Sequence, residues 1–158
     1  MQEVLFNQED CNYILSGIDT SPGTSDLDTN DRKYKEWLIV DRNILDFILN
    51  KVSHLGVGQI KEGRILRYET GCFFDQHLDT WHKYPHRLKT LLIQLSDELD
   101  YTGGNMTFGG ELFNKQIGNV TMFDGKVWHG MEEVTSGERY VFVIWLDRDD
   151  MGISKNIL

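Results

Sequence analysis

The stretch Arg139-Tyr-Val-Phe-Val-Ile-Trp-Leu146 is the strongest structural signal in this chain. Its run of aromatic and β-branched residues is typical of a buried β-strand. Because side chains alternate along a strand, every second residue from Arg139 to Trp145 is expected on one face. Arg139 places a cation on that otherwise apolar face. We therefore expect an anionic partner for Arg139, because an unpaired buried charge is too costly to keep.

Short β-strands are predicted along most of the chain from residue 64 onward. The candidate strands are Arg64–Tyr68, Phe73–Asp79, Leu88–Leu95, Met106–Phe108, Val120–Phe123, Val127–Val134 and Arg139–Leu146. Glycine-containing turns separate them at Thr102-Gly-Gly104, Gly109-Gly110, Asp124-Gly125 and Ser136-Gly137. Many short strands at close spacing indicate a β-sandwich or barrel.

The N-terminal third is predicted to be mainly helical. Asn7 is a favourable N-cap for a first helix, which has an apolar stripe. A second helix is expected to begin near Asp41 and to end at Gly56. Residues 21–31 are rich in Ser, Gly, Pro and Asp, so we expect a loop there.

The length of 158 residues predicts a single domain with one core. In this interpretation the domain spans residues 1–158. Residues 1–60 would form supporting helices and a loop, and residues 61–150 would form the β-core.

Composition and charge limit the function classes. The net charge of −9 argues against a general nucleic-acid-binding protein, because Lys and Arg provide most of the affinity for phosphates. No stretch is long and apolar enough to span a bilayer, and the N-terminus lacks the basic region of a signal peptide. We therefore expect a soluble, cytoplasmic protein in which Cys11 and Cys72 remain free thiols.

His77-Leu-Asp79 and the distant His129-Gly130 together provide two imidazoles and one carboxylate. This ligand set suits a non-haem Fe(II) site with open coordination positions. His77 and Asp79 are two residues apart, so on one strand they would point to the same face. A hydrogen-bonded His–Asp pair at a strand end is the alternative for the tripeptide alone. Together with Arg139, the pattern indicates a metal site that also binds a small molecule carrying a carboxylate.

A longer series of motifs resembles a known family. In chain order the motifs are Leu66-Arg-Tyr68, Gly71, His77-Leu-Asp79, Arg87-Leu-Lys-Thr90, Gly103-Gly104, Phe108, Phe123, His129-Gly130, Val134, Gly137-Glu-Arg139-Tyr140 and Trp145. In this order and spacing, residues 64–147 resemble the Fe(II)/2-oxoglutarate-dependent dioxygenases of the prolyl 4-hydroxylase type. The resemblance implies a mainly β fold, a double-stranded β-helix (jelly roll), with flanking N-terminal helices.

The resemblance also implies roles for the residues of the expected metal and cosubstrate sites. His77, Asp79 and His129 would bind the iron. Arg139 would bind the distal carboxylate of 2-oxoglutarate, because its planar guanidinium suits a bidentate pair.

Four further residues match or replace members of the family's cosubstrate pocket. Tyr68 and Thr90 match pocket residues, with an ordinary core role as the alternative for each. Trp145 matches a wall of the site. Gln94 stands where these enzymes often carry a cosubstrate-binding Tyr, and its amide could still donate to a carboxylate.

The activity that the resemblance implies is hydroxylation of a substrate C–H bond. It would use Fe(II), 2-oxoglutarate and O2, would release succinate and CO2, and would take ascorbate as an optional addition. Peptidyl proline is the expected substrate. The alternatives are a free amino acid or small metabolite, and a catalytically silent β-helix module that binds metal and ligand. Nucleic acid is disfavoured by the acidic charge, and the oligomeric state stays open. The loop Trp81–His86 is either substrate-facing or an ordinary solvated loop.

Overall fold

The computed structural model describes residues 1–153, and the two α-helices of this part of the chain lie in its N-terminal third. The helical elements are α1 (Gln8–Leu15), η1 (Ser16–Thr20), α2 (Arg42–Val52), η2 (Ser53–Leu55) and the later η3 (Glu98–Asp100). Asn7 begins α1 with a capping box, in which its side chain and that of Asp10 each accept the other's backbone N–H at 2.9 Å. Asp41 caps α2, and Gly56 follows η2 with a φ of 92°, a conformation that favours glycine. Both predicted helices are confirmed.

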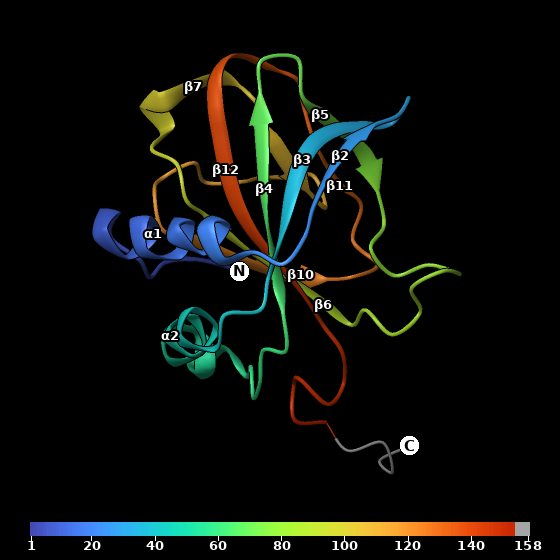
Figure 1. Ribbon diagram of the computed structural model, residues 1–158. Coiled ribbons are helices and arrows are strands. Elements are labelled where there is room, and N and C mark those ends of the chain that lie inside the picture. The colour runs from blue at the N-terminus through green and yellow to red at the C-terminus, as the bar shows by residue number, and fades with distance from the viewer. Residues whose placement is uncertain (154–158) are drawn as a thin grey trace.

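Twelve strands form an antiparallel sheet in the described part of the chain. They are β1 (Gln2–Val4), β2 (Thr24–Asp28), β3 (Arg32–Ile39), β4 (Gly63–Glu69), β5 (Phe73–His77), β6 (Lys89–Gln94), β7 (Tyr101–Gly103), β8 (Met106–Phe108), β9 (Glu111–Leu112), β10 (Asn119–Asp124), β11 (His129–Met131) and β12 (Val134–Leu146). The hydrogen-bonded order is β1-β10-β6-β12-β4-β3-β5-β11-β8-β9, with β2 beside β3 and β7 beside β12. The long strand β12 therefore lies between β6 and β4, as Figure 1 shows for β4.

The predicted loop over residues 21–31 is wrong in part, because Thr24–Asp28 forms β2. This strand pairs with β3 from Thr24 opposite Trp37 to Asp28 opposite Lys33. Four of its five side chains are exposed, so backbone hydrogen bonds rather than a buried face hold it in place. A strand without a buried face has no apolar alternation, and the sequence pattern therefore gave no signal for it.

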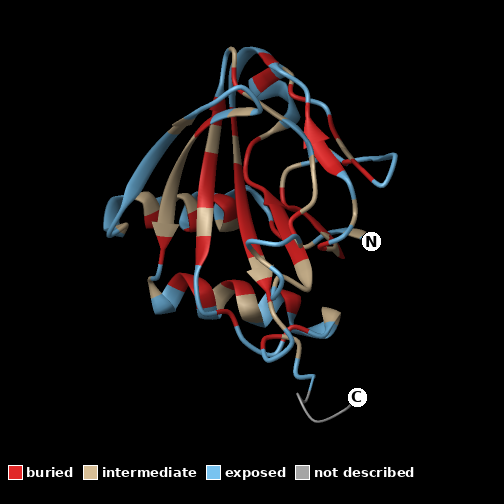
Figure 2. Ribbon diagram, turned by 90° about the vertical axis from the view of Figure 1, so that its right-hand side faces the viewer, coloured by how far each residue is buried: buried red, intermediate tan, exposed pale blue. Residues whose placement is uncertain are grey.

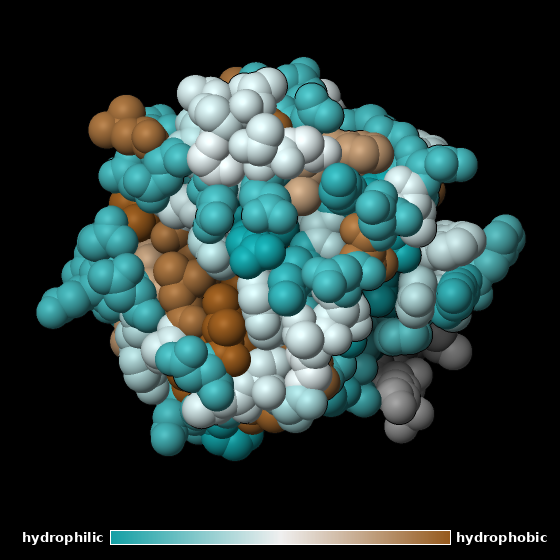
Figure 3. All heavy atoms as spheres, turned by 45° about the horizontal axis from the view of Figure 1, so that its top comes forward, coloured by the Kyte–Doolittle hydropathy of each residue, from teal (hydrophilic) through white to brown (hydrophobic). Residues whose placement is uncertain are grey.

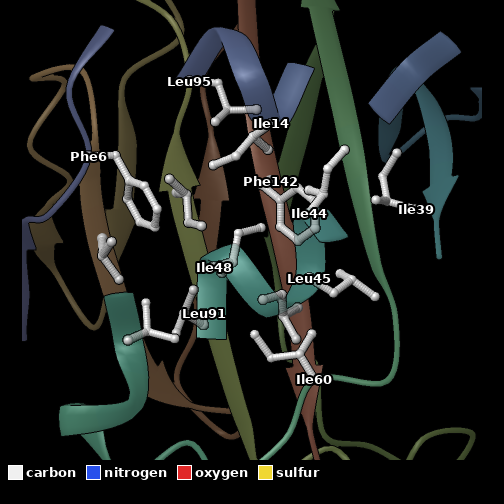
Figure 4. Close-up of a cluster of buried hydrophobic side chains, with 14 of the residues drawn as sticks. Phe6, Ile14, Ile39, Ile44, Leu45, Ile48, Ile60, Leu91, Leu95 and Phe142 are labelled. Carbon is white, nitrogen blue, oxygen red and sulfur yellow. The ribbon is translucent and has the colours of Figure 1, made fainter. Parts of the chain in front are cut away.

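Alternation along β12 divides its side chains between two apolar cores. Phe142 and Ile144 belong to the core shared with α1 and α2, where they pack with Ile14 and Ile48 among others. Figure 4 shows these helix and strand side chains meeting between the elements. Val141 and its neighbours of the same parity belong to the second core, on the other side of the sheet. The helices thus cover one face of the sheet and leave the other face free to line a cavity.

Burial and polarity agree with this arrangement. Buried residues are concentrated in the central strands and on parts of the helices (Figure 2). The face shown in Figure 3 is mainly hydrophilic, with apolar residues gathered in a limited area. No helix among residues 1–153 combines the length and the apolar character needed to cross a membrane.

Candidate active site

The expected metal ligands come from two neighbouring strands and the turn that follows one of them. His77 is the last residue of β5 and His129 the first of β11, and these two residues are paired across the strands. Asp79 lies two residues beyond β5, where its backbone N–H donates to the carbonyl of Gly125 at 3.0 Å. The predicted strand Phe73–Asp79 therefore ends earlier than expected.

The three side chains nevertheless converge on one point. The Nε2 atom of His77 lies 3.4 Å from Oδ1 of Asp79, and Nε2 of His129 lies 3.3 Å from Oδ2. One ligand atom from each of the three residues lies within 4.8 Å of the other two. Asp79 and His129 are buried and His77 is half-buried. This geometry brings together all three predicted metal ligands.

Hydrogen bonds to the backbone orient both imidazoles. His77 Nδ1 lies 2.7 Å from the carbonyl oxygen of Asp75, and His129 Nδ1 lies 2.9 Å from that of Val127. A carbonyl only accepts, so each Nδ1 carries the hydrogen and each Nε2 is left to face Asp79. The Nε2 atoms and the carboxylate would then present three acceptors to the same space. A metal cation can bind to all three of these groups at once. Metal-binding histidines commonly donate a hydrogen bond from their other ring nitrogen, as both Nδ1 atoms do here.

Asp79 is held in its ionised form. Burial raises the pKa of its carboxyl, but the neighbouring His129 and His77 side chains and the Thr90 hydroxyl outweigh burial, so the pKa lies well below its usual range. The Thr90 hydroxyl donates to Oδ2 of Asp79 at 2.5 Å. We expected Thr90 beside the cosubstrate, and in the structure its hydroxyl orients Asp79.

Arg139 is fully enclosed, with 2% of its surface exposed. Its Nε donates to Oε1 of Gln94 at 3.0 Å, and its Nη1 lies 3.1 Å from the thioether sulfur of Met131, a weak acceptor. Nη2 is buried without a hydrogen-bond partner, and among the described residues no carboxylate forms an ion pair with Arg139. The anionic partner that the sequence analysis required is therefore not a protein side chain of the described region.

Gln94 lies in the hydrogen-bond network around this guanidinium. Its Oε1 accepts from Arg139, and its Nε2 donates to the Tyr101 hydroxyl at 2.9 Å and to the Ser96 carbonyl at 3.2 Å. Both functional ends of the amide are thus in use. The register of β6 against β12 brings Gln94 opposite Val141 and so next to Arg139. The sequence analysis had assigned no role to Tyr101.

Tyr68 and Trp145, the two remaining predicted residues, line the same space. Tyr68 is paired with Arg139 across β4 and β12, and the guanidinium carbon lies 5.8 Å from the centre of its ring. Burial raises the pKa of the Tyr68 hydroxyl, which keeps its proton available for donation. Trp145 faces the cavity from the other end of β12.

One cavity joins the metal ligands to Arg139. Its volume is about 430 Å³, in the range of small-molecule sites. Sequence reasoning gave no role to several residues that line it, which are Tyr34, Arg64, Phe74, Tyr84, Arg87, Met106 and Met131. For Met131 the sequence did indicate a place in the site, because this residue lies two positions after His129 on the same strand. None existed for Tyr34, because β3 was not predicted.

Comparisons with known proteins agree with this geometry. The sequence profile described as the 2OG-Fe(II) oxygenase superfamily matches residues 63–147. The chain is 29% identical over 114 residues to a PKHD-type hydroxylase of Synechococcus sp. (strain CC9902), a match that covers 69% of this chain and 51% of that protein. It is 24% identical over 173 residues to a PKHD-type hydroxylase of Rippkaea orientalis, covering 93% and 77%. The match thus spans about half the length of the Synechococcus protein.

Solved structures show the same fold. A prolyl-4-hydroxylase of Pseudomonas putida superposes with a TM-score of 0.72 at 16% identity, over 93% of this chain and 91% of the other. A prolyl hydroxylase from Trichoplax adhaerens, in complex with a peptide fragment of hypoxia inducible factor, superposes with a TM-score of 0.71 at 13% identity, over 99% and 87%. The predicted jelly-roll fold with N-terminal helices is confirmed.

Proposed function

The chain belongs to the 2OG-Fe(II) oxygenase superfamily, and on that basis we propose that it is an Fe(II)- and 2-oxoglutarate-dependent dioxygenase. It would hydroxylate peptidyl proline and release succinate and CO2. One observation carries the proposal: Nη2 of the buried Arg139 is unpaired in the cavity that the metal ligands line. A dicarboxylate that extends from the metal ligands to Arg139 would bind the metal at one end and pair with the guanidinium at the other.

We propose His77, Asp79 and His129 as the iron ligands. Their two imidazole nitrogens and one carboxylate suit Fe(II) and leave positions open for other ligands. When bound, Fe(II) supplies the redox chemistry that couples O2 and 2-oxoglutarate to hydroxylation. The chain contributes the orientation of the ligands: the carbonyls of Asp75 and Val127 fix the two rings, and Thr90 fixes the carboxylate.

We propose Arg139 as the residue that binds the distal carboxylate of 2-oxoglutarate. Its Nη2 would donate to that carboxylate, and the protonated Tyr68 hydroxyl would add a second donor from β4. Gln94 would act as a positioning residue, because its Oε1 fixes the guanidinium plane. Trp145 would form a wall of the cavity and help to exclude water from the reacting groups.

Prolyl specificity has support from the relatives. Two of the curated relatives are named PKHD-type hydroxylases, and prolyl hydroxylases are among the structural neighbours, one of them with a peptide bound. These names describe the other proteins. They make a peptide with an accessible proline the first substrate to test.

The test is an incubation of the purified protein with Fe(II), ascorbate and a library of proline-containing peptides, with and without 2-oxoglutarate. We expect a gain of one oxygen by mass spectrometry, together with succinate, only when 2-oxoglutarate is present. Asp79→Ala should abolish both signals. Asp75→Ala is the matched control, because Asp75 is exposed and orients His77 through its backbone only. Oxygenated product from the Asp79→Ala protein would contradict the ligand assignment.

A further inference from the structure

Arg87 lines the cavity, and its guanidinium stacks on two aromatic rings. Its guanidinium carbon is 3.7 Å from the centre of the Tyr84 ring and 3.8 Å from the centre of a ring of Trp145. No hydrogen bond or ion pair within residues 1–153 involves this guanidinium. The side chain is half-buried, and burial lowers its pKa, although an arginine keeps its charge. Arg87 is therefore a partly desolvated cation that the charge of Asp79 reaches but that no carboxylate of the described residues contacts directly.

Because aromatic rings stack on the guanidinium of Arg87, its N–H donors can bind a ligand only in the plane of the guanidinium. Aromatic rings stack on the face of a planar guanidinium, while its N–H donors point outward in the plane. In-plane donors in a fixed fork match the two oxygens of a carboxylate. Because Tyr84 and Trp145 already restrain the plane, little side-chain freedom remains to be lost when a carboxylate binds.

The surroundings of Arg87 favour an anion. Apart from the metal ligands and Arg139, the cavity lining includes more cations than carboxylates, namely Arg32, Arg64, Lys83 and Arg87 against Asp31 and Glu36. Arg64 stacks on Trp145 with its guanidinium carbon 5.1 Å from the ring centre. Its ion pairs with Glu36 and Glu62 are long, at 3.8 and 3.9 Å. This local excess of positive charge contrasts with the net charge of −9 and would attract an anion to the cavity.

Arg87 is also tied to the metal centre through the fold. Its carbonyl accepts a hydrogen bond from the hydroxyl of Thr80, the residue that follows Asp79. On the other side, Trp145 is paired with Thr90, whose hydroxyl donates to Asp79. The segment Trp81–His86 contributes Trp81, Lys83 and Tyr84 to the lining, so this loop faces the site. A group bound at Arg87 would therefore lie in the same cavity as the metal ligands.

We propose that the substrate carries a carboxylate close to the carbon that is hydroxylated, and that Arg87, supported by Arg64, binds this carboxylate. The inference rests on the proposed function and narrows its substrate class. Two sources share this chemistry: an acidic side chain next to the reacting residue of a peptide, and the α-carboxylate of a free amino acid. Arg87 would set specificity, while Arg139 binds the cosubstrate.

The test compares candidate substrates that carry a carboxylate with matched compounds that carry a neutral amide in its place. Blocked peptides with proline flanked by Asp or Glu are matched with peptides flanked by Asn or Gln, and free proline is matched with prolinamide. We expect kcat/KM to favour the acid of one of these pairs by roughly tenfold or more, as for a hydrogen bond to a charged group. The peptide and free amino acid arms then identify the source of the carboxylate.

Variants of Arg87 assign the preference to this residue. In Arg87→Gln the acid preference should disappear, because kcat/KM for the acid falls to the value for its amide. Arg87→Lys should retain part of the preference, because it keeps the charge but loses the planar fork. Lys51→Gln is the control for net charge, since Lys51 is exposed on α2 and does not line the cavity. It should keep the full preference.

A binding measurement separates failure of this inference from failure of the proposed function. The affinities of the acids and amides are measured on the protein loaded with Mn(II) and 2-oxoglutarate, which requires no turnover. Binding that favours acids and depends on Arg87, without any hydroxylation, would overturn the proposed reaction and keep the inference. Equal binding and turnover of acids and amides, or an acid preference that survives in Arg87→Gln, would overturn the inference.

Discussion

At the scale of single residues, the charge of Arg139 depends on a neutral neighbour. Gln94 accepts from Nε of Arg139 at 3.0 Å and donates to the Tyr101 hydroxyl, and Gln94 is completely buried. A neutral acceptor orients a guanidinium without neutralising it. The charge on Nη1 and Nη2 thus stays available to an incoming carboxylate.

Two substitutions of Gln94 test this role. Gln94→Leu leaves Nε of Arg139 and the Tyr101 hydroxyl unpaired, so we expect a loss of stability of about 1–3 kcal/mol and a higher KM for 2-oxoglutarate. Gln94→Glu supplies a permanent anion that competes with the cosubstrate, so the KM should rise by about tenfold or more even if the variant is as stable as wild type. Succinate release against 2-oxoglutarate concentration and thermal unfolding measure the two effects. An unchanged KM in both variants would count against the role.

The metal ligands give a second prediction at this scale. His129→Ala removes one of three ligands and should abolish tight binding of Fe(II) under anaerobic conditions, measured by calorimetry. His54→Ala is the control, since His54 is exposed and its Nε2 contacts Glu3 on the surface. Loss of metal binding in both variants, or in neither, would contradict the assignment.

Single residues also show where sequence reasoning reached its limit. The proximity of His77 and Asp79 could be predicted from their local spacing, although Asp79 lies beyond the end of β5 and not on the strand with His77. The partner of Gln94 could not, because it depends on the register between β6 and β12, which are far apart in the sequence. Thr90 was predicted beside the cosubstrate, and only the three-dimensional structure reveals that its hydroxyl contacts Asp79.

At the scale of elements, the contact between β4 and β12 requires a residue without a side chain. A Cβ atom on Gly63 would lie 2.3 Å from a ring carbon of Phe142, which is itself fully buried on β12. We expect Gly63→Ala to lower the free energy of unfolding by about 1–3 kcal/mol, as overpacking does elsewhere. Gly23→Ala is the matched control, because nothing lies within 4 Å of its Cβ position. Urea denaturation should separate the two variants, and equal stabilities would contradict the packing argument.

Elements were predictable where one face is buried. The stripe of α2 and the alternation of β12 both face apolar cores. The second helix was predicted close to its observed bounds, whereas β12 begins at Val134 and not at Arg139 as predicted. The short or exposed strands β1, β2, β7 and β9 have little buried apolar surface, and backbone pairing to a partner defines them. The apolar residues of β3 are separated by charged ones, which obscured its period. Pairing partners are set by the fold as a whole, so the local sequence carried no signal for these strands.

At the scale of the whole molecule, the two apolar cores differ in function. The core under α1 and α2 is closed and gives the sheet its support. The second core leaves a cavity of about 430 Å³, lined by the three expected metal ligands and by Arg139, whose Nη2 has no hydrogen-bond partner among the described residues. A metal ion and a carboxylate bound in this cavity would pair with the charges of Asp79 and Arg139. Binding should thus be visible in the stability of the entire molecule.

Because bound ligands stabilise the folded protein, thermal unfolding should detect their binding, with Mn(II) in place of Fe(II) to prevent turnover. Mn(II) should stabilise the wild type, and 2-oxoglutarate should add a second increment, about 2.7 kcal/mol at a hundred times its Kd. Arg139→Gln should keep the first increment and lose most of the second. Without ligands this variant should lose little or no stability, because it removes a buried charge that has no anionic partner. A full second increment in Arg139→Gln would mean that 2-oxoglutarate binds elsewhere.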